Sequence, residues 1–334
     1  MKSRPPLPRV PHTAMSRLSL PLLLLLALTA CQKDLVRWPY YQKTHFTVAF
    51  DWTAAPSAQP SEMMLVMFAE NGGRPLDYGF AGHAGGQLDL AAGNYKALAY
   101  NGDTETLTGL GTTWENYELT THEVELSRVS PLFASRASVP RAEGAEDEPV
   151  ILQPDMAWTG AVTEILAGEH ERETATLPMR PAVYTYTINI SQVKNLGYVT
   201  NISATISGMS SSMHPATGRP TENHGTIPVT LSTDSRSSIT ATFRSFGHCP
   251  SEEIEAGHVL VVYARLVDGS KWYYEVNVTS ALHDADHVAP DETGRNVEIP
   301  IEVSGIPFPK PFTNGSGMHP DVEDWMEVEE DVFM

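Results

Sequence analysis

The stretch GQLDLAAGNYKALAYN, Gly86–Asn101, decides the fold class. Apolar residues occupy every second position on each side of a turn at Ala92-Gly93-Asn94. These apolar positions are Leu88, Leu90, Tyr95, Ala97 and Ala99. Period-two alternation is typical of strands with one buried face, and Gly93 suits the positive-φ position of a tight turn. The stretch therefore predicts two strands joined by a hairpin or a tight corner.

Strand patterns of the same kind recur along the chain. They cover Thr44–Trp52, Met63–Ala69, Val183–Ser191, Val199–Ser207, Thr226–Ser232, Ser237–Phe246, His258–Thr279 and Asn296–Val303. Within His258–Thr279, Asp268-Gly269-Ser270 carries a strong hairpin signal. Helical candidates are few, namely one or two turns at Val162–Gly168 and Ser280–His287. Many short strands at regular spacing predict an all-β protein built from sandwiches.

The length of the chain predicts two such sandwiches. About 300 residues remain after an amino-terminal leader, which is more than one typical core accommodates. Arg136–Pro149 has no apolar periodicity and holds an acidic cluster, so it is expected to be an exposed linker or long loop. We expect an amino-terminal sandwich over residues 44–157 and a carboxyl-terminal one over residues 158–334, with a terminal strand at residues 322–334.

The first thirty residues predict a secretory signal. They contain four basic residues and no acidic one, followed by the apolar run Leu18–Ala30. A run of thirteen residues is too short to cross a hydrocarbon core, which needs about twenty. A basic flank with a short apolar core is typical of a signal peptide, here residues 1–30. Met15 gives a leader of more ordinary length than Met1 does.

Leu28-Thr29-Ala30-Cys31 resembles the lipobox of bacterial lipoproteins. In those proteins the cysteine thiol takes a diacylglycerol, the peptidase cuts before the cysteine, and the new amino group is usually acylated, often with palmitate. Several acyl chains give lasting attachment, whereas a single chain would come off. We therefore predict a lipid anchor on Cys31 at the outer membrane. The alternative is an ordinary signal peptide with a chance cysteine.

Gln32-Lys33-Asp34 opens the predicted tether of residues 31–43. It resembles the short lysine-plus-acid signal that directs lipoproteins of Bacteroidetes-type bacteria to the outer face of the cell. Leu35 stands where a second acidic residue is usual, so the match is partial. An ordinary polar tether is the alternative.

Charge and cysteine content exclude several classes of protein. The chain holds 22 basic and 41 acidic residues, and loss of the four basic residues of the leader takes its net charge from −19 to −23. Binding to nucleic acid depends on basic residues that neutralise phosphates, so nucleic acid is not an expected partner. Cys249 is the only cysteine besides Cys31, so lipidation leaves no pair for an internal disulfide.

Candidate catalytic and metal-binding patterns are weak, and we predict neither an enzyme nor a cofactor. In a helix His283 and His287 would share a face, as a metal-binding pair does, but Pro290 cuts the helix short. A solvated loop without metal is the preferred interpretation. His248-Cys249 could suggest a thiol nucleophile, yet no third partner is evident, and a half-buried cysteine is preferred.

Five of the six tryptophans allow two interpretations. They are Trp52, Trp114, Trp158, Trp272 and Trp325. Exposed together, they would form a platform on which sugar rings stack. Distributed through sandwich cores, they would serve packing, and this second interpretation is preferred.

Several segments, taken in order, resemble fimbrillin-like surface lipoproteins of Bacteroidetes. The segments are DLAAGNYKALAYNGD at 89–103, ISGMSSSM at 206–213, TFRSFG at 242–247, VVYARLVDGSKWYYEVNVT at 261–279 and DVEDWMEVEEDV at 321–332. The resemblance is greatest to a lipoprotein group of unknown function related to minor-fimbrium anchor subunits. It implies two transthyretin-like or immunoglobulin-like sandwich domains and subunits that join by strand exchange.

Within this family, anchor subunits keep their lipid, whereas others are cut after an arginine and lose it. Arg37 lies too close to Cys31 for an ordinary amino-terminal strand to be removed ahead of it, which favours a retained anchor. The terminal strand is a candidate donor, or it simply completes its own sheet. Its residues of interest are Val322, Trp325, Met326, Val328 and Val332.

The leading hypothesis from sequence is an anchor or accessory subunit of fimbriae. It would be attached through Cys31 to the bacterial outer membrane, exposed at the cell surface, and bound to other fimbrial subunits by strand complementation. The alternative is a lipoprotein that binds a glycan or a host ligand, working beside a nutrient importer. Exposed tryptophans on a flat face would favour the alternative, and a detachable edge strand would favour the lead.

Overall fold

The structure is a computed structural model. It describes residues 43–134, 138–168, 174–233, 236–250, 257–285, 298–312 and 324–328. In these ranges no helix is both long and apolar enough to span a membrane. The predicted leader and lipobox, and the predicted tether up to residue 42, lie outside the described residues, and Lys43 begins the first strand.

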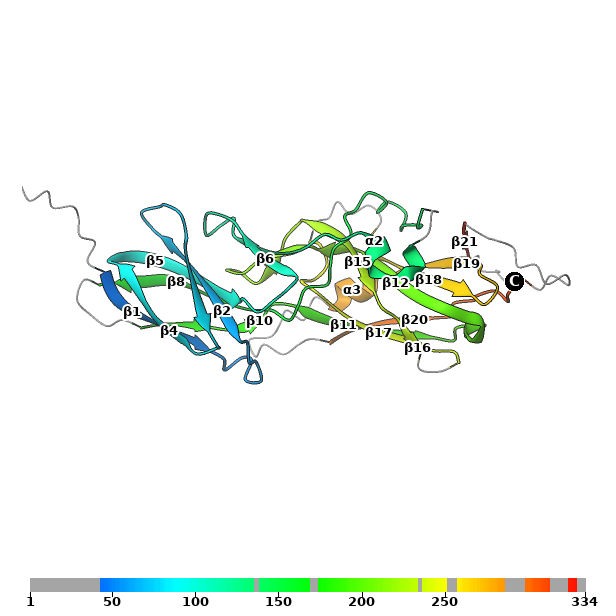
Figure 1. The fold of residues 1–334 in the computed structure, drawn as a ribbon, viewed down its shortest axis with the longest axis horizontal. Coiled ribbons are helices and arrows are strands. Elements are labelled where there is room, and N and C mark those ends of the chain that lie inside the picture. The colour runs from blue at the N-terminus through cyan, green and yellow to red at the C-terminus, as the bar shows by residue number, and fades with distance from the viewer. Residues whose placement is uncertain are drawn as a thin grey trace, which may run out of the picture. The chain divides into compact units, whose positions relative to one another are not determined.

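Two sheets form the first sandwich (Figure 1). One has the strand order β4-β1-β9 and the other β10-β8-β5-β2-β3. The strands are β1 (Lys43–Asp51), β2 (Glu62–Ala69), β3 (Leu76–Ala81), β4 (Gly85–Ala91), β5 (Gly93–Asn101), β8 (Trp158–Ala167), β9 (Thr174–Pro178) and β10 (Arg180–Pro181). Strand β1 lies in the centre of its sheet, antiparallel to β4 and parallel to β9.

The alternating residues of these strands fill the first core. Its buried members include Phe46, Val48, Met63, Leu65, Leu90, Ala97, Ile165 and Leu177. They come from both sheets, which is why the two sheets pack face to face. At Gly93, whose φ is +157°, the chain passes from β4 in one sheet to β5 in the other. The corner predicted from the opening stretch is therefore confirmed, and the hairpin alternative is wrong.

Two further sheets form the second sandwich, with the orders β16-β17-β11-β20 and β15-β12-β18-β19-β21. The strands are β11 (Tyr184–Ser191), β12 (Val199–Ser210), β15 (His224–Val229), β16 (Ser232–Thr233), β17 (Ile239–Ser245), β18 (Val259–Leu266), β19 (Lys271–Asn277), β20 (Glu298–Ser304) and β21 (Trp325–Glu327). Their inward side chains form one core that includes Tyr186, Ile188, Ile206, Phe243, Val262 and Ile301. The predicted hairpin at Asp268–Ser270 joins β18 to β19 and is confirmed.

A fifth, four-stranded sheet has the order β14-β13-β7-β6. Its strands are β6 (Leu107–Leu110), β7 (Glu118–Thr121), β13 (Ser212–His214) and β14 (Arg219–Pro220). The short helices are α2 (Leu126–Val129), η1 (Pro131–Phe133), η2 (Leu196–Tyr198) and α3 (Thr279–Ala285). The pairing of β7 with β13 brings residues from the two halves of the chain into one small sheet. The all-β sandwich architecture predicted from sequence is confirmed.

The strand pairing differs from the boundary predicted between residues 157 and 158. Strand β8 pairs with β5, and β9 pairs with β1, so residues 158–178 complete the sheets of the first sandwich. The helical turn expected at Val162–Gly168 is wrong, because that stretch lies within β8 and its end alternates, with Ile165 and Ala167 buried. Pairing with β5 outweighs the local helical preference of Glu-Ile-Leu-Ala.

The described part of the segment predicted as an exposed linker, residues 138–149, packs against the second sandwich instead. Ala142 and Ala145 are 3% and 1% exposed and lie in a cluster with Val261 and Tyr263 of β18. The Tyr263 hydroxyl donates a hydrogen bond to the carbonyl of Pro140 at 2.7 Å. The outer face of this sheet is apolar, so burying it explains why a segment without apolar periodicity still docks there.

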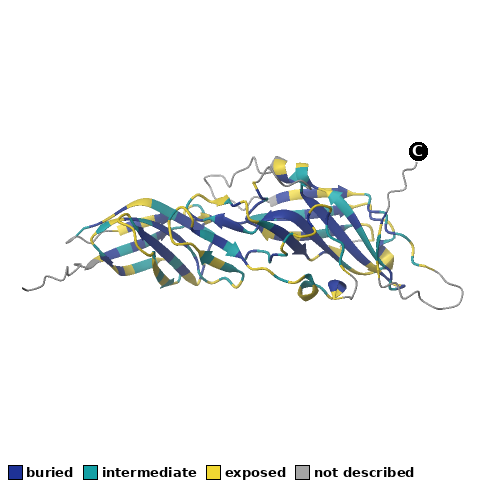
Figure 2. Ribbon diagram, turned by 90° about the horizontal axis from the view of Figure 1, so that it is seen from above, coloured by how far each residue is buried: buried dark blue, intermediate teal, exposed yellow. Residues whose placement is uncertain are grey.

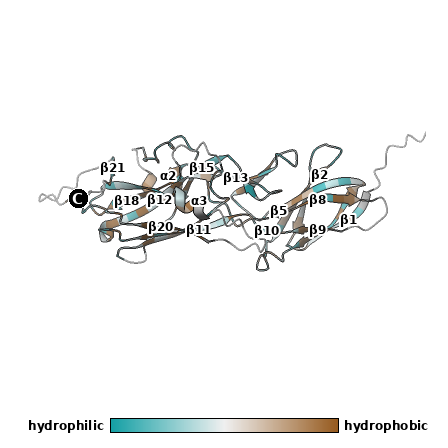
Figure 3. Ribbon diagram, turned by 180° about the vertical axis from the view of Figure 1, so that it is seen from behind, coloured by the Kyte–Doolittle hydropathy of each residue, from teal (hydrophilic) through white to brown (hydrophobic). Residues whose placement is uncertain are grey.

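Figures 2 and 3 show the result of this packing. Buried residues follow the strands of both sandwiches, whereas exposed residues gather on connecting segments (Figure 2). The hydropathy colouring shows hydrophobic residues along strands such as β1, β8 and β20 (Figure 3). Burial of these stripes is the main stabilising contribution, at about 25 cal/mol per Å² of apolar surface.

Candidate functional site

The carboxyl-terminal strand β21 lies at the edge of the second sandwich. It pairs in parallel with β19 through Lys271↔Trp325, Trp272↔Met326 and Tyr273↔Glu327. The other neighbouring strands of this sheet, β15, β12, β18 and β19, are antiparallel to one another. Parallel pairing is slightly less stable per residue, and three paired residues are few. The described part of β21 is therefore a short addition to a sheet that is otherwise complete.

The side chains of this segment enter two different clusters. Trp325 packs edge-on against Tyr263 with ring centroids 5.3 Å apart, and the Nζ of Lys271 lies 5.7 Å from its ring centroid. Val328 is 7% exposed and belongs to the core of the second sandwich. Its amide donates a hydrogen bond of 2.9 Å to the carbonyl of Tyr273. The segment is thus held on both faces of its sheet.

Repulsion between carboxylates at this edge of the sheet opposes the packing of β21 against β19. Burial, followed by the carboxylates of Glu327, Glu143 and Glu146, raises the pKa of Glu275 above its ordinary value of 4.5, although a backbone hydrogen bond from Glu143 works in the opposite direction. Glu275 lies on β19 and Glu327 on β21, so the two strands carry facing like charges. The hydroxyl of Tyr273 donates a hydrogen bond of 3.3 Å to Glu327, which offsets part of this repulsion. Burial raises the pKa of Tyr263 to about 12, so that ring stays neutral beneath Trp325.

The amino-terminal strand β1, in contrast to β21, lies in the centre of its sheet. It pairs with β4 on one side and β9 on the other, over most of its length. Phe46 and Val48 are each 1% exposed and stand in the middle of the first core. Removing this strand would separate β4 from β9 and open the core, so β1 is an integral part of the sandwich.

The structure brings together Trp325, Met326 and Val328 of the predicted donor strand, in a segment that pairs with its own chain. Val322 and Val332 lie outside the described residues. The predicted lipidation residue Cys31, the lipobox residues Leu28, Thr29 and Ala30, and the export signal Gln32, Lys33 and Asp34 lie outside them as well.

The five tryptophans within the described residues are distributed over separate clusters and do not form one platform. Trp52 and Trp158 meet edge to face, 6.1 Å apart, at the first core. Trp272 packs against the second core and Trp325 against Tyr263. Cys249 is 2% exposed, and its thiol donates a hydrogen bond to the carbonyl of Glu222 at 3.2 Å, which suits a structural cysteine better than a nucleophile.

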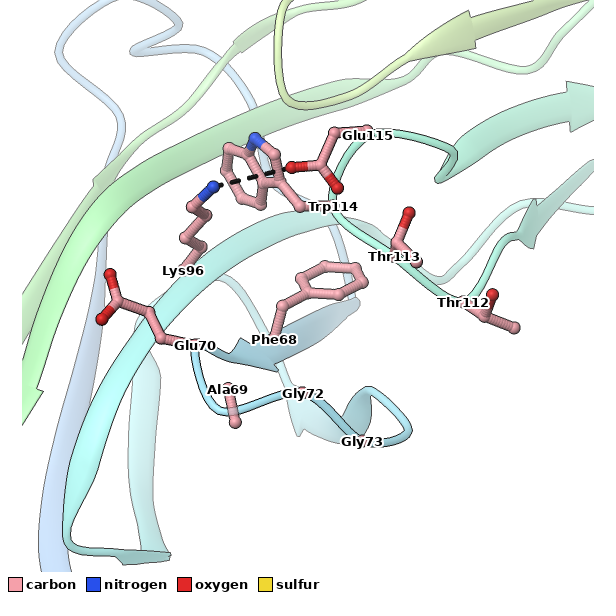
Figure 4. A pocket seen from close by; sticks show the side chains of 10 residues that line it. All are labelled: Phe68, Ala69, Glu70, Gly72, Gly73, Lys96, Thr112, Thr113, Trp114 and Glu115. Carbon is pink, nitrogen blue, oxygen red and sulfur yellow. Dashed lines mark ion pairs between the residues drawn. The ribbon is translucent and has the colours of Figure 1, made fainter.

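The fifth tryptophan, Trp114, lines a pocket that sequence analysis missed. The pocket has a volume of about 460 Å³, and its lining residues are Phe68, Ala69, Glu70, Gly72, Gly73, Lys96, Thr112, Thr113, Trp114 and Glu115. Figure 4 shows the ion pair between Lys96 and Glu115, 3.7 Å long, passing beside the indole ring of Trp114. Three separate segments supply these residues, so no local pattern in the sequence reveals the pocket.

Two sandwich cores, a central amino-terminal strand and an edge-bound carboxyl-terminal strand define a tandem β-sandwich protein. The chain belongs to the family described as "Domain of unknown function (DUF5119)", which matches residues 30–230. Comparison with curated proteins gives no match.

Solved structures are similar to this chain to different degrees, and the first of those that follow shares its fold. A "putative adhesin" from Bacteroides ovatus is 19% identical, with a TM-score of 0.62, over 84% of this chain and 97% of that one. The fimbrial anchor protein Mfa2 from Porphyromonas gingivalis is 11% identical, with a TM-score of 0.46, over 78% of this chain and 90% of that one. A "putative polysaccharide binding" protein from Bacteroides thetaiotaomicron has the same identity and coverages, with a TM-score of 0.48. The predicted resemblance to fimbrillin-like proteins is confirmed at the level of the fold.

Proposed function

We propose that this protein is a cell-surface adhesin of the fimbrial type, acting as an anchor or accessory subunit attached to the outer membrane through lipid on Cys31. The observation that carries the proposal is the central place of β1 in the first sandwich. The predicted lipid site lies shortly before Lys43, where β1 begins. Because β1 is an integral part of the sandwich, a lipid attached shortly before this strand stays with the folded protein. The shared fold with a structure described as an adhesin supports the same class.

Assembly with other fimbrial subunits would use the opposite end of the chain. If the three-residue pairing of β21 opens, the edge of β19 presents free backbone donors and acceptors, which an extended segment of another subunit can pair with. The displaced β21 segment can in turn enter a neighbour. This role is structural and needs no catalytic residue or cofactor.

Anchoring is tested in the native bacterium by shearing filaments from the cells and following this chain by immunoblot. Wild type should remain in the membrane pellet, and Cys31→Ala should release filaments into the medium. Wild type found within the sheared polymer would make it a shaft or tip subunit. A chain absent from filaments, with no filament defect in the variant, would refute the fimbrial proposal.

Strand exchange is tested by locking β21 in place. Tyr273 and Glu327 are direct partners across β19 and β21, so the double variant Tyr273→Cys/Glu327→Cys places two thiols at a separation that a disulfide can span. The oxidised variant should fail to join filaments, and a mild reductant should restore assembly. Each single variant is the matched control. Assembly of the oxidised variant at the wild-type level would exclude exchange through β21.

A second candidate function rests on the Trp114 pocket. Its indole ring offers a surface for stacking a sugar, and Thr112, Thr113 and Glu70 supply polar groups at the rim. Glycan-array binding that is lost in Trp114→Ala and kept in Trp272→Ala would support a glycan-binding lipoprotein. Equal binding by wild type and Trp114→Ala would exclude this pocket as the site.

A further inference from the structure

Three histidines from separate segments converge beside the second sandwich. His248 follows β17, His258 directly precedes β18, and His283 lies on α3. One ring nitrogen of each lies within 4.8 Å of the others. The sequence analysis considered His283 only with His287, which lies outside the described residues. The structure instead groups it with two residues that are 25 and more positions away.

The spacing of the nitrogens suits a metal ion. The Nε2 atoms of His258 and His283 are 3.2 Å apart. Nitrogens bound to one tetrahedral zinc ion at about 2.0–2.1 Å lie about 3.3 Å from each other, so this edge of the polyhedron is already formed. The ring of His248 stacks on that of His283 at 4.5 Å and meets that of His258 at 5.2 Å. His248 is half-buried and His283 is exposed, so rotation of these two side chains can close the remaining edges.

The backbone around the three residues is firmly held. His248 forms an antiparallel bridge with Met209, which is fully buried. The amide of His258 donates a hydrogen bond of 2.8 Å to the Oγ1 of Thr279, at the start of α3. Leu282, next to His283, is fully buried in the second core. Ligands on rigid elements keep their geometry better than ligands on free loops.

The innermost histidine is oriented by its own hydrogen bond. His258 is 2% exposed, and its Nδ1 lies 3.2 Å from the carbonyl oxygen of Ser207. A carbonyl only accepts, so Nδ1 carries the proton and the lone pair of Nε2 faces the other two histidines. Gly208 allows this close packing, because a Cβ there would lie 2.5 Å from that Nδ1 and its φ is +72°. Carbonyl–histidine pairs of this kind orient the ligands of metal sites.

We propose that His248, His258 and His283 bind one zinc ion, with a fourth position open to water. Three neutral imidazoles suit a borderline-soft cation such as zinc. Without metal, the Nε2–H of His283 donates to the Nε2 of His258. When zinc binds to the Nε2 of His283, that proton leaves to solvent and Nδ1 takes one up from solvent, so His283 stays a neutral imidazole with its proton on Nδ1 and no net proton is lost. The bound ion would link the segment after β17 and helix α3 to the start of β18. This structural role is independent of any role in fimbriae.

The test uses the purified chain without a polyhistidine tag, stripped of metal with EDTA. Zinc chloride binding is measured by calorimetry, and cobalt chloride reports a tetrahedral site through its visible absorption. The main variant is His283→Ala, because this residue is exposed and its loss leaves the core intact. His248→Ala is the second variant, and His45→Ala, whose side chain is 77% exposed on β1, is the matched control.

Wild type and His45→Ala should each bind one zinc ion per chain, and zinc should raise their melting temperature by roughly 5 °C. His283→Ala and His248→Ala should bind at least about tenfold more weakly, because even changes to outer partners of a metal site cost about 10- to 100-fold. Absence of one-to-one binding by wild type would overturn the proposal. Unchanged zinc affinity in both variants would also overturn it.

Discussion

The two ends of the described chain are both strands with alternating apolar residues, yet their settings are opposite. Strand β1 has a hydrogen-bonded neighbour on each side and places Phe46 and Val48 in the middle of a core. Within the described residues, β21 has one neighbouring strand and three paired residues, and only Val328, which follows it, lies in the main core. The comparison shows that position in the sheet, rather than strand pattern, determines how firmly each end is held. This difference predicts four effects of decreasing size.

The largest effect is expected at β1. Phe46→Ala removes a ring that is 1% exposed and leaves a cavity between the two sheets, which should destabilise the first sandwich by about 3–5 kcal/mol. Chemical denaturation followed by circular dichroism measures the loss in free energy of unfolding. Hydrogen exchange of the β1, β4 and β9 peptides shows where it occurs. Leu166→Ala, at a 65% exposed position of β8, is the control and should change stability by no more than about 0.5 kcal/mol.

A smaller effect is expected at β21. Trp325→Ala loses the edge-on contact with Tyr263 and part of the cover over β18, which should cost about 2 kcal/mol because Trp325 is only half-buried. Faster hydrogen exchange should be confined to β19 and the segment around Ala142. Trp325→Phe keeps an aromatic ring and should recover most of the loss. If Trp325→Ala lowered the free energy of unfolding as much as Phe46→Ala does, the two end strands would contribute equally to stability and the contrast between them would be wrong.

The third effect depends on pH. Glu275 has a raised pKa in the folded protein, because of its burial and of Glu327 on β21 together with Glu143 and Glu146 on the docked segment. The folded chain therefore holds this proton to higher pH than the unfolded chain does. Stability should fall as the pH rises above about 4.5 through the raised pKa. The effect is smaller than that of Trp325→Ala, because solvent screens partly exposed charges.

The measurement is the melting temperature between pH 4.5 and pH 7, compared in wild type and Glu275→Gln. The variant should lose this part of the pH dependence, and its advantage over wild type should be greatest at pH 7. Glu302→Gln, on β20, is the matched control and should follow wild type. Parallel curves for wild type and Glu275→Gln would contradict the assignment of the effect to this carboxyl group.

The smallest effect concerns the cation above Trp325. Lys271→Met keeps most of the aliphatic stem of the side chain and removes the charge 5.7 Å from the ring centroid, which should cost about 0.5 kcal/mol. Lys271→Arg retains a cation and should match wild type. Urea denaturation of the three proteins side by side measures the difference. A loss in Lys271→Arg equal to that in Lys271→Met would show that packing, rather than charge, is responsible.

Much of the fold could be predicted from sequence, because alternation and turn residues are local signals. The corner at Gly93 and the hairpin at Asp268–Ser270 are examples, since both depend on a few adjacent residues. The docking of residues 138–149 could not be predicted, because Ala142 and Ala145 carry no periodic pattern and are buried by a sheet distant in sequence.

The candidate sites were harder to predict for the same reason. The edge position of β21 depends on which strand it pairs with, and sequence left open whether it is donated or kept. The Trp114 pocket and the three-histidine cluster each combine residues from three segments, so only the folded chain brings them together. The proposed lipid site, in contrast, depends on a local motif, so it stays a prediction from sequence alone.

The parallel pairing of β1 with β9 also sets the order in which the protein can fold. A chain emerges amino-terminus first, at about 5–20 residues per second, so β1 waits roughly ten seconds for Thr174–Pro178 to appear. During that interval Phe46 and Val48 cannot be buried in a finished sandwich, and the edge of β1 is open to wrong partners. The first strand to be made thus gains its last partner only when about half of the chain has been synthesised, and a holdase that covers β1 during this interval would raise the yield of folded protein.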